Sequence, residues 1–123
     1  DKAPMTVHFR TVGVALQALL TPADRYFISD PTGSGESAVI LRYELDRGAK
    51  FAGVVSAFDS RGLKTLERIL LNPELNAIIV FSMDKGFAEL LGRNFPPGST
   101  YLLRREGLGS WRYVTSWPQP AVK

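Results

Sequence analysis

The sequence predicts a single α+β domain with a mixed β-sheet, and three observations support this class. The spacing of hydrophobic residues alternates along the chain between the period of two that suits strands and the period of about 3.6 that suits helices. The longest apolar run, residues 76–83, has the length of a buried strand and is too short to span a membrane. No linker or tandem repeat divides the chain, so we expect residues 1–117 to form the domain and residues 118–123 a flexible tail.

The expected order of elements is β-α-β-β-β-α-β-α-β-β, with about three helices. Strands are predicted at residues 5–10, 25–29, 38–45, 51–58, 76–83, 99–105 and 110–117, and helices at residues 12–20, 60–71 and after residue 84. Thr11 is the expected N-cap of the first helix. This order predicts helices packed on a mixed sheet.

The predicted centre of the sheet is an antiparallel hairpin, residues 38–59. Its first strand alternates, with the apolar residues Val39, Leu41, Tyr43 and Leu45 on one face. Residues 47–49 form the expected turn, and the second strand is apolar on both faces, as is typical of a strand near the middle of a sheet. The hairpin is therefore expected to be a scaffold, with function at its flanks.

Composition excludes some functions and leaves others open. The chain has no cysteine, which excludes disulfides, thiolate catalysis and cysteine-based zinc sites. Its net charge is +3, and arginine favours bidentate contacts with phosphate and carboxylate groups. A solvated basic edge and an anionic partner are both compatible with this charge. The composition fits cytoplasm and periplasm equally, and it predicts no membrane insertion.

One stretch resembles a phosphate-binding loop. Residues 30–37 (DPTGSGES) are similar to the loop of P-loop ATPases, and the positions that would cradle phosphate are Gly33, Ser34, Gly35 and Ser37. Asp30 replaces the first glycine of that motif, and Glu36 stands where a lysine should reach the phosphates, so it would repel them. The segment after the loop alternates like a strand, whereas the motif needs a helix. A plain loop is the prediction, and a degenerate nucleotide site is the alternative.

Catalytic and metal-binding sets are sparse. His8 is the only histidine, and we expect a polar position on a strand at the sheet edge and not a general base. Glu44 and Asp46 share a face of a predicted strand, but Arg42 lies beside them, which favours a solvated face with cross-strand ion pairs. The sequence therefore predicts no catalytic residue, no metal site and no cofactor.

The C-terminal hairpin is the most suggestive surface. Aromatic residues and arginines gather there, and the candidate binding residues are Tyr101, Arg104, Arg105, Trp111, Arg112, Tyr113 and Trp117. Such a surface is typical of protein interfaces, in which Trp, Tyr and Arg dominate. It also suits single-stranded nucleic acid, whose bases stack on aromatic rings. The third alternative is that the aromatic side chains close the core.

About half of the chain resembles the short N-terminal domains of secretins and TonB-dependent transducers. Those domains have a strand, a helix of ALxxLL type and a strand that ends in Asp-Pro before a glycine-bearing loop. Ala15-Leu16 and Leu19-Leu20 match the helix, and residues 28–31 match the end of the strand. A helix at residues 63–71 followed by residues 76–80 is similar to the next secretin domain. The resemblance implies a non-catalytic periplasmic interaction domain in a secretion or pilus assembly.

We therefore expect a non-enzymatic interaction module whose partner is another protein. A bacterial secretion, pilus or conjugation assembly is the expected setting. The alternatives are a nucleic-acid-binding domain that uses the C-terminal hairpin and a degenerate nucleotide-binding protein. On the leading hypothesis, Trp111→Ala or Arg112→Ala weakens partner capture and leaves thermal stability nearly intact. The sequence does not determine the oligomeric state.

Overall fold

The computed structural model describes residues 4–30, 36–46, 48–55, 60–83, 85–92, 94–95 and 98–118. The elements follow in the order α1 (Pro4–Leu19), β1 (Arg25–Ser29), α2 (Glu36–Glu44), β2 (Lys50–Val55), α3 (Ser60–Leu70), β3 (Ala77–Phe81), α4 (Lys85–Leu91), β4 (Thr100–Gly107) and β5 (Ser110–Trp117). The strands form one five-stranded sheet in the order β2-β1-β3-β4-β5. The predicted class, a single α+β domain with a mixed sheet, is confirmed, with four helices in the described residues where about three were expected.

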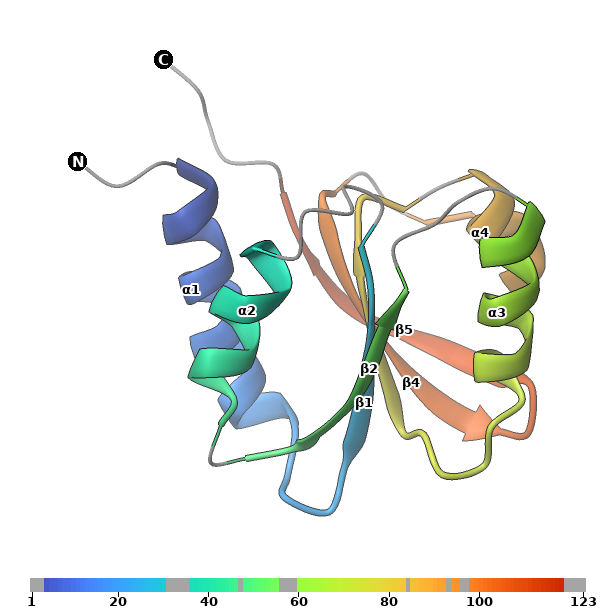
Figure 1. The fold of residues 1–123 in the computed structure, drawn as a ribbon, viewed down its shortest axis with the longest axis horizontal. Coiled ribbons are helices and arrows are strands. Elements are labelled where there is room, and N and C mark those ends of the chain that lie inside the picture. The colour runs from blue at the N-terminus through green and yellow to red at the C-terminus, as the bar shows by residue number, and fades with distance from the viewer. Residues whose placement is uncertain are drawn as a thin grey trace.

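Helices cover both faces of the sheet (Figure 1). Strand β1 pairs in parallel with β2 on one side and with β3 on the other, whereas β4 and β5 are added antiparallel. The chain therefore crosses from β1 to β2 through α2, and then crosses back over β1 to β3 through α3. Parallel crossovers are almost always right-handed, so two crossovers in opposite directions place their helices on opposite faces.

Each face of the sheet has its own hydrophobic core. On one face α1 and α2 pack through side chains such as Leu16 and Leu41 against alternate residues of β1 and β3, Ile28 and Ile79 among them. On the other face α3 and α4 pack against the residues in between. Because both faces are covered, β3 is buried along its whole length, as its continuous apolar run predicts.

The predicted hairpin at residues 38–59 is wrong. Residues 36–44 form the helix α2, and residues 50–55 form the strand β2, which runs parallel to β1 at the edge of the sheet. The segment AVILRYEL satisfies two periods at once: its alternation suits a strand, but Ala38, Leu41 and Leu45 also recur at helical spacing. These three are the residues that α2 and the following turn bury. A parallel neighbour to β1 needs a crossover helix, so the tertiary arrangement selects the helical period.

The predicted strand at residues 5–10 is also helical. Phe9 lies one turn before Val12 and two turns before Leu16, and all three are buried in the core between α1 and the sheet, so the helical period begins earlier than predicted. Thr11 is therefore not an N-cap; it lies inside α1, and its hydroxyl donates to the carbonyl of Val7 at 2.9 Å. Pro4 begins the helix, at the position where a missing N–H costs least.

The remaining strands agree with their predictions. β1 has the predicted bounds, and the C-terminal hairpin is present as β4 and β5 with a turn at residues 108–109. Residues 56–58 of the predicted second strand and residues 119–123 of the predicted flexible tail lie outside the described residues. Within the described part of the chain, no helix has the length and apolar character needed to cross a membrane.

Candidate functional site

The C-terminal hairpin presents less of its aromatic surface than the sequence suggested. Tyr101 and Trp111 are 4% and 3% exposed, and both belong to the core beneath α3 and α4. The indole N–H of Trp111 donates to the carbonyl of Leu70 at 2.9 Å, and the hydroxyl of Tyr101 donates to the carbonyl of Gly98 at 3.0 Å. These two rings therefore close the core, which is one of the three alternatives that the sequence left open.

The other two aromatic residues of the hairpin lie on opposite faces. Tyr113 packs at the edge of the core that holds Trp111, where its ring contacts that of Phe95. Trp117 packs against the core beneath α1 and α2. Simple alternation would place both rings on one face, but Val114 is the extra residue of a β-bulge opposite Leu102 and Leu103. The structure therefore does not bring the predicted aromatic face together.

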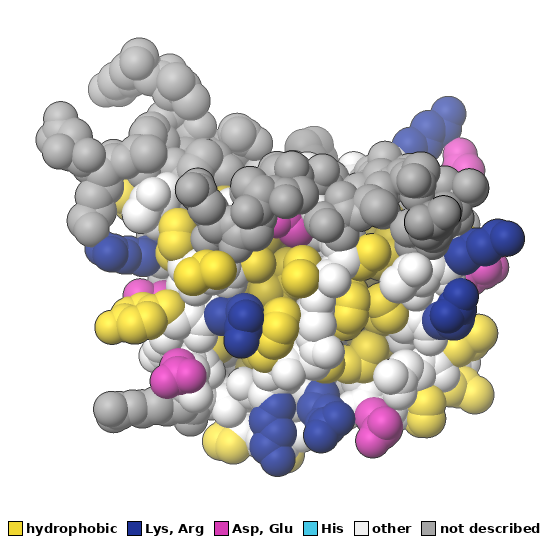
Figure 2. Space-filling model, viewed as in Figure 1, with side chains coloured by type: hydrophobic (Ala, Val, Ile, Leu, Met, Phe, Trp, Pro, Cys, Tyr) yellow, Lys and Arg dark blue, Asp and Glu magenta, His cyan; other side chains and the backbone are white. Residues whose placement is uncertain are grey.

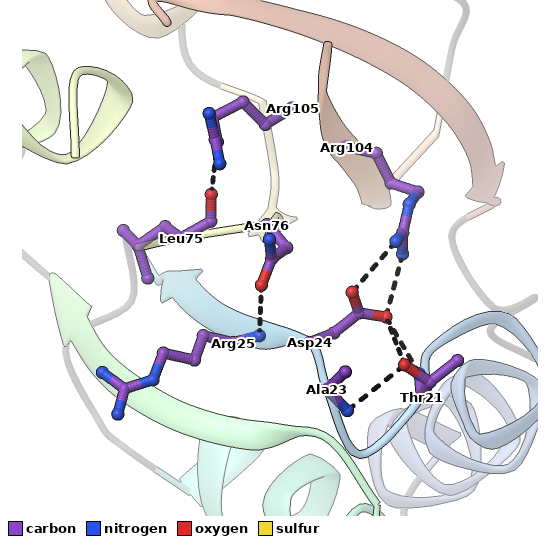
Figure 3. Close-up of polar contacts among 8 residues, drawn as sticks. All are labelled: Thr21, Ala23, Asp24, Arg25, Leu75, Asn76, Arg104 and Arg105. Carbon is purple, nitrogen blue, oxygen red and sulfur yellow. Dashed lines mark hydrogen bonds and ion pairs between the residues drawn. The ribbon is translucent and has the colours of Figure 1, made fainter. Parts of the chain in front are cut away.

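Two of the three hairpin arginines are engaged within the chain (Figure 3). The guanidinium of Arg104 donates to both carboxylate oxygens of Asp24, at 3.0 and 3.3 Å. Arg105 donates through Nε and its terminal nitrogen to the carbonyls of Leu75 and Pro73, each at 2.8 Å. These contacts tie the hairpin to the N-terminal ends of β1 and β3, and they leave Arg112 as the exposed arginine of β5. A nucleic-acid site on this hairpin would have to displace both sets of contacts.

The pKa of Asp24 reflects this arrangement. Burial by itself raises the pKa of the carboxyl group, but the hydrogen bonds from Arg104 and from the backbone of Thr21, together with the charge of Arg104, outweigh it and lower the pKa below its usual value. Asp24 is therefore a structural anion whose charge is satisfied inside the fold.

The structure changes the interpretation of the glycine-rich loop in one respect. Gly33, Ser34 and Gly35 lie outside the described residues, but Ser37 lies in the first turn of α2. A helix does follow the loop, so the expectation of a strand there is wrong. The chemical departures remain, because the motif lysine is still Glu36 and its first glycine is still Asp30, a fully buried carboxyl group.

His8 occupies a buried position on α1 and not the predicted polar edge of a strand. Its side chain lies against the start of β4, with Nε2 at 2.9 Å from the hydroxyl of Thr100 and at 3.3 Å from that of Ser99. The histidine is 8% exposed, and burial lowers its pKa below 6.5. Through its contacts with these two hydroxyls, His8 links α1 to the sheet, and its ring also packs edge-on against that of Phe9.

We expect the buried His8 to make the fold sensitive to mild acid. The unfolded chain takes up a proton near pH 6.5, whereas the folded chain does so only at lower pH. The contribution of the neutral His8 to the free energy of unfolding should therefore be fully present above pH 6.5. It should fall as the pH drops toward the folded pKa, by at most about 1.4 kcal/mol per pH unit. Urea unfolding of the wild type and of His8→Gln at several pH values measures the difference; equal slopes in the two proteins would contradict it.

No group of three or more metal-ligating side chains gathers in the part of the chain that the structure describes. Glu44 and Asp46 do not share a strand face, because neither lies on a strand. Glu44 is the last residue of α2 and packs against Gly13 of α1, and Asp46 is exposed in the turn after the helix. The interpretation of these two residues as partners in cross-strand ion pairs is therefore wrong.

An open, partly apolar surface lies between α2 and β2, and we call it the α2–β2 groove. It is an open hollow of about 720 Å³, and the side chains around it include Val39, Arg42, Tyr43, Asp46, Lys50 and Phe51. Val39 and Tyr43 are 62% and 78% exposed. Figure 2 shows this side of the molecule, with hydrophobic side chains gathered over its middle and Lys and Arg side chains around them.

The floor of the groove includes a buried aromatic ring, and its rim carries charged residues. Tyr26 forms part of the floor, and burial raises its pKa to about 12, so its hydroxyl stays neutral. The guanidinium of Arg42 lies 3.8 Å from the centre of the Phe51 ring, in a cation–π contact that fixes one wall. A second hollow, of about 550 Å³, continues from Tyr43 toward Gln17 of α1.

The outer edge of β2 adjoins this groove. No other described strand pairs with that edge, and Val54, 46% exposed, lies on the strand beside it. Sequence reasoning missed this site because residues 38–45 were interpreted as a strand. Had the helical period been chosen, Val39 and Tyr43, one turn apart and opposite the buried Leu41, would have stood out as an unexplained apolar pair.

Comparison of the chain with models of protein families, with curated proteins and with solved structures gave no match.

Proposed function

We propose that this domain is a non-catalytic protein-interaction module that binds its partner through the α2–β2 groove. One observation carries the proposal: apolar side chains of α2 and β2 lie exposed beside a strand edge with which no other described strand pairs. Apolar side chains gathered on a surface, with charged residues at the rim, are typical of sites where proteins associate. The groove thus replaces the C-terminal hairpin as the expected contact surface.

The same geometry argues against the nucleic-acid alternative. Single-stranded nucleic acid needs free cations beside accessible rings, whereas Arg104 and Arg105 are engaged and Trp111 is buried. The groove itself has charges of both signs, Arg42 and Lys50 against Asp46, which suits a protein surface better than a polyanion.

The resemblance to secretin domains suggests the kind of assembly in which the protein acts, but it identifies no binding residue. A helix at residues 60–70 followed by a strand at residues 77–81 accords with it, whereas the strand that it implies near residue 5 is helical. We propose a secretion, pilus or conjugation assembly as the setting in which the partner is found.

Photo-crosslinking tests the proposal. A photoreactive phenylalanine analogue placed at Tyr43 should form protein adducts in native extract, and nuclease and about 0.5 M salt should leave them unchanged, because phosphate contacts weaken steeply with salt. The matched control is the same analogue at Leu108, which is 68% exposed in the turn between β4 and β5. Adducts that are equal at both positions, or that vanish with nuclease, would contradict the proposal.

Alanine variants give the expected magnitude. Tyr43→Ala and Val54→Ala should each weaken partner binding about tenfold, which corresponds to about 1.4 kcal/mol for loss of an apolar contact at an interface. Both side chains are exposed, so the free energy of unfolding should change by less than about 0.5 kcal/mol. Leu108→Ala should change neither quantity. A binding titration with the partner identified by crosslinking measures the first effect, and urea unfolding measures the second.

A further inference from the structure

We propose that the partner at the α2–β2 groove binds as an extended peptide strand, which pairs with the outer edge of β2 and carries an acidic residue opposite Lys50. The inference rests on the proposed function and names the kind of partner that the same site takes. Strand addition is a common mode of peptide recognition, in which main-chain hydrogen bonds supply affinity and the surfaces beside the edge select the side chains. β2 offers both contributions.

The backbone of β2 has hydrogen-bonding groups directed to its outer edge. The N–H of Lys50 and the carbonyl of Val55 are both bonded to main-chain groups at the two ends of β1. Because backbone directions alternate along an extended strand, the next residues inward, Phe51 and Val54, direct their N–H and carbonyl groups away from β1. No other described strand pairs with that edge. An added strand would therefore find bonding partners on both sides of the bulge at Ala52.

The groove gives one face of the added strand an apolar surface. Phe51 lies beside Tyr26 in the register of the parallel strands, on the face of the sheet that α1 and α2 cover. Val54 lies beside Ile28 on the same face and is 46% exposed. Apolar side chains of the added strand that point toward α2 would therefore bury Val54 and lie over the groove.

The charges at the start of β2 favour an acidic strand. Arg42 and Lys50 line the groove with one acid, Asp46. Arg25 lies beside Lys50 on β1, its guanidinium points away from Asp24 (Figure 3), and neither Arg25 nor Lys50 forms an ion pair within the described residues. A lysine on an edge strand discourages indiscriminate pairing, whereas an acidic residue directly opposite turns its charge into an attraction. The partner strand is therefore expected to carry Asp or Glu opposite Lys50.

Selection from a displayed library supplies the probe and tests the expected chemistry. The wild-type chain is the target, and the library holds random peptides of about ten residues, long enough to pair along all of β2. We expect the selected peptides to alternate apolar and polar residues and to contain more Asp and Glu than Lys and Arg. A chain that selects no peptide, or one that selects basic peptides, overturns the inference.

Val54→Pro tests the main-chain pairing. Proline removes the outward N–H at this position but no hydrogen bond to β1, and edge strands tolerate proline in such places. The matched control, Val54→Thr, keeps the N–H and the branched shape of the side chain. The proline variant should bind a selected peptide about tenfold more weakly or worse, and the threonine variant within about threefold of the wild type. Equal binding by the proline variant and the wild type overturns the inference.

Amide hydrogen exchange of the wild type decides the same point without a variant, including the case in which Val54→Pro does not fold. A bound peptide should slow exchange at the amides of Phe51 and Val54 about tenfold or more, because both gain a hydrogen-bond acceptor. The amide of Lys50, already bonded to the carbonyl of Asp24, should slow much less. Exchange at Phe51 and Val54 that the peptide slows no more than at Lys50 overturns the inference.

Two charge variants of opposite sign test the acidic residue of the partner. Lys50→Gln should weaken the selected peptide about two- to fivefold and Asp46→Asn should strengthen it by a similar factor, as expected for exposed charge pairs. Lys64→Gln and Glu106→Gln remove the same charges at exposed positions elsewhere and should leave the affinity unchanged. Changes of the same sign in Lys50→Gln and Asp46→Asn, or no change in either, overturn the inference.

The two proposals fail in different ways. If the photoreactive residue at Tyr43 captures a partner whose binding Val54→Pro leaves unchanged, strand addition is excluded and the interaction module stands. If adducts at Tyr43 only equal those at Leu108, the interaction module falls and strand addition falls with it. Adducts at Tyr43 that the selected peptide displaces support both.

Discussion

Replacing Trp111 by alanine should destabilise the domain by about 3–5 kcal/mol, the usual cost of removing a large buried aromatic side chain. The ring is 3% exposed in the core beneath α3 and α4, and its indole N–H satisfies the carbonyl of Leu70 near the end of α3. The variant therefore loses apolar burial and leaves a buried acceptor unsatisfied. Since domains of this size are stable by only about 5–15 kcal/mol, the change removes much of the total.

Two matched variants separate the causes. Trp111→Phe keeps an aromatic ring but loses the donor to Leu70, so it should cost about 1–3 kcal/mol. Arg112→Ala, at the exposed neighbouring position, should change the free energy of unfolding by less than about 0.5 kcal/mol. Urea unfolding followed by far-ultraviolet circular dichroism measures all three variants. A Trp111→Ala protein as stable as the Arg112→Ala protein would show that the ring is not buried, as the hypothesis of a binding surface on the hairpin required.

Replacing Asp24 by alanine should cost about 2–3 kcal/mol, because its carboxylate joins β4 to the turn between α1 and β1. Its oxygens accept from Arg104 of β4 and from the backbone N–H of Thr21, and its side chain is only 9% exposed (Figure 3). The main-chain carbonyl of Asp24 accepts from the N–H of Lys50 at the start of β2, and the alanine variant keeps this bond. Removing the carboxylate leaves a partly buried N–H and a partly buried guanidinium without this partner.

A double-mutant cycle and a pH titration check this role. Arg104→Met should cost only about 1 kcal/mol, because Arg104 is 29% exposed and Asp24 keeps the hydrogen bond from Thr21, and the two changes together should cost less than their sum. The lowered pKa of Asp24 means that its contribution is present above pH 3.8 and is lost as the pH falls through the folded pKa. Additive effects, or an Asp24→Ala protein with the acid sensitivity of the wild type, would contradict the role.

The errors of the sequence interpretation have a common cause. Residues 5–10 and 38–45 are short apolar segments that satisfy the period of a strand and that of a helix. Local spacing cannot choose between them when the segment is shorter than about ten residues. The choice depends on what lies on either side: residues 4–9 extend a helix already indicated by Val12 and Leu16, and α2 must carry the chain between two parallel strands.

The candidate site was harder to predict than the fold, for a related reason. The C-terminal hairpin was recognised as a hairpin, but the bulge at Val114 reverses the face of Trp117, and nothing in the spacing of SWRYVTSW indicates a bulge. The engagement of Arg104 depends on Asp24, eighty residues earlier. The α2–β2 groove exists only because α2 is a helix and β2 an edge strand, so an error in one element concealed the site.

The sequence by itself determined the class of the fold, the strands β1 and β3, the helix α3 and the C-terminal hairpin, because the apolar pattern of each of these segments fits one period better than the other. Only the tertiary structure decided the order β2-β1-β3-β4-β5, the helical state of α2 and the side of the chain that remains exposed. Strand order and exposure depend on contacts between distant segments. Residues such as Leu41 and Val39 differ little in hydrophobicity, and only the packing against the sheet buries the first and leaves the second in the groove.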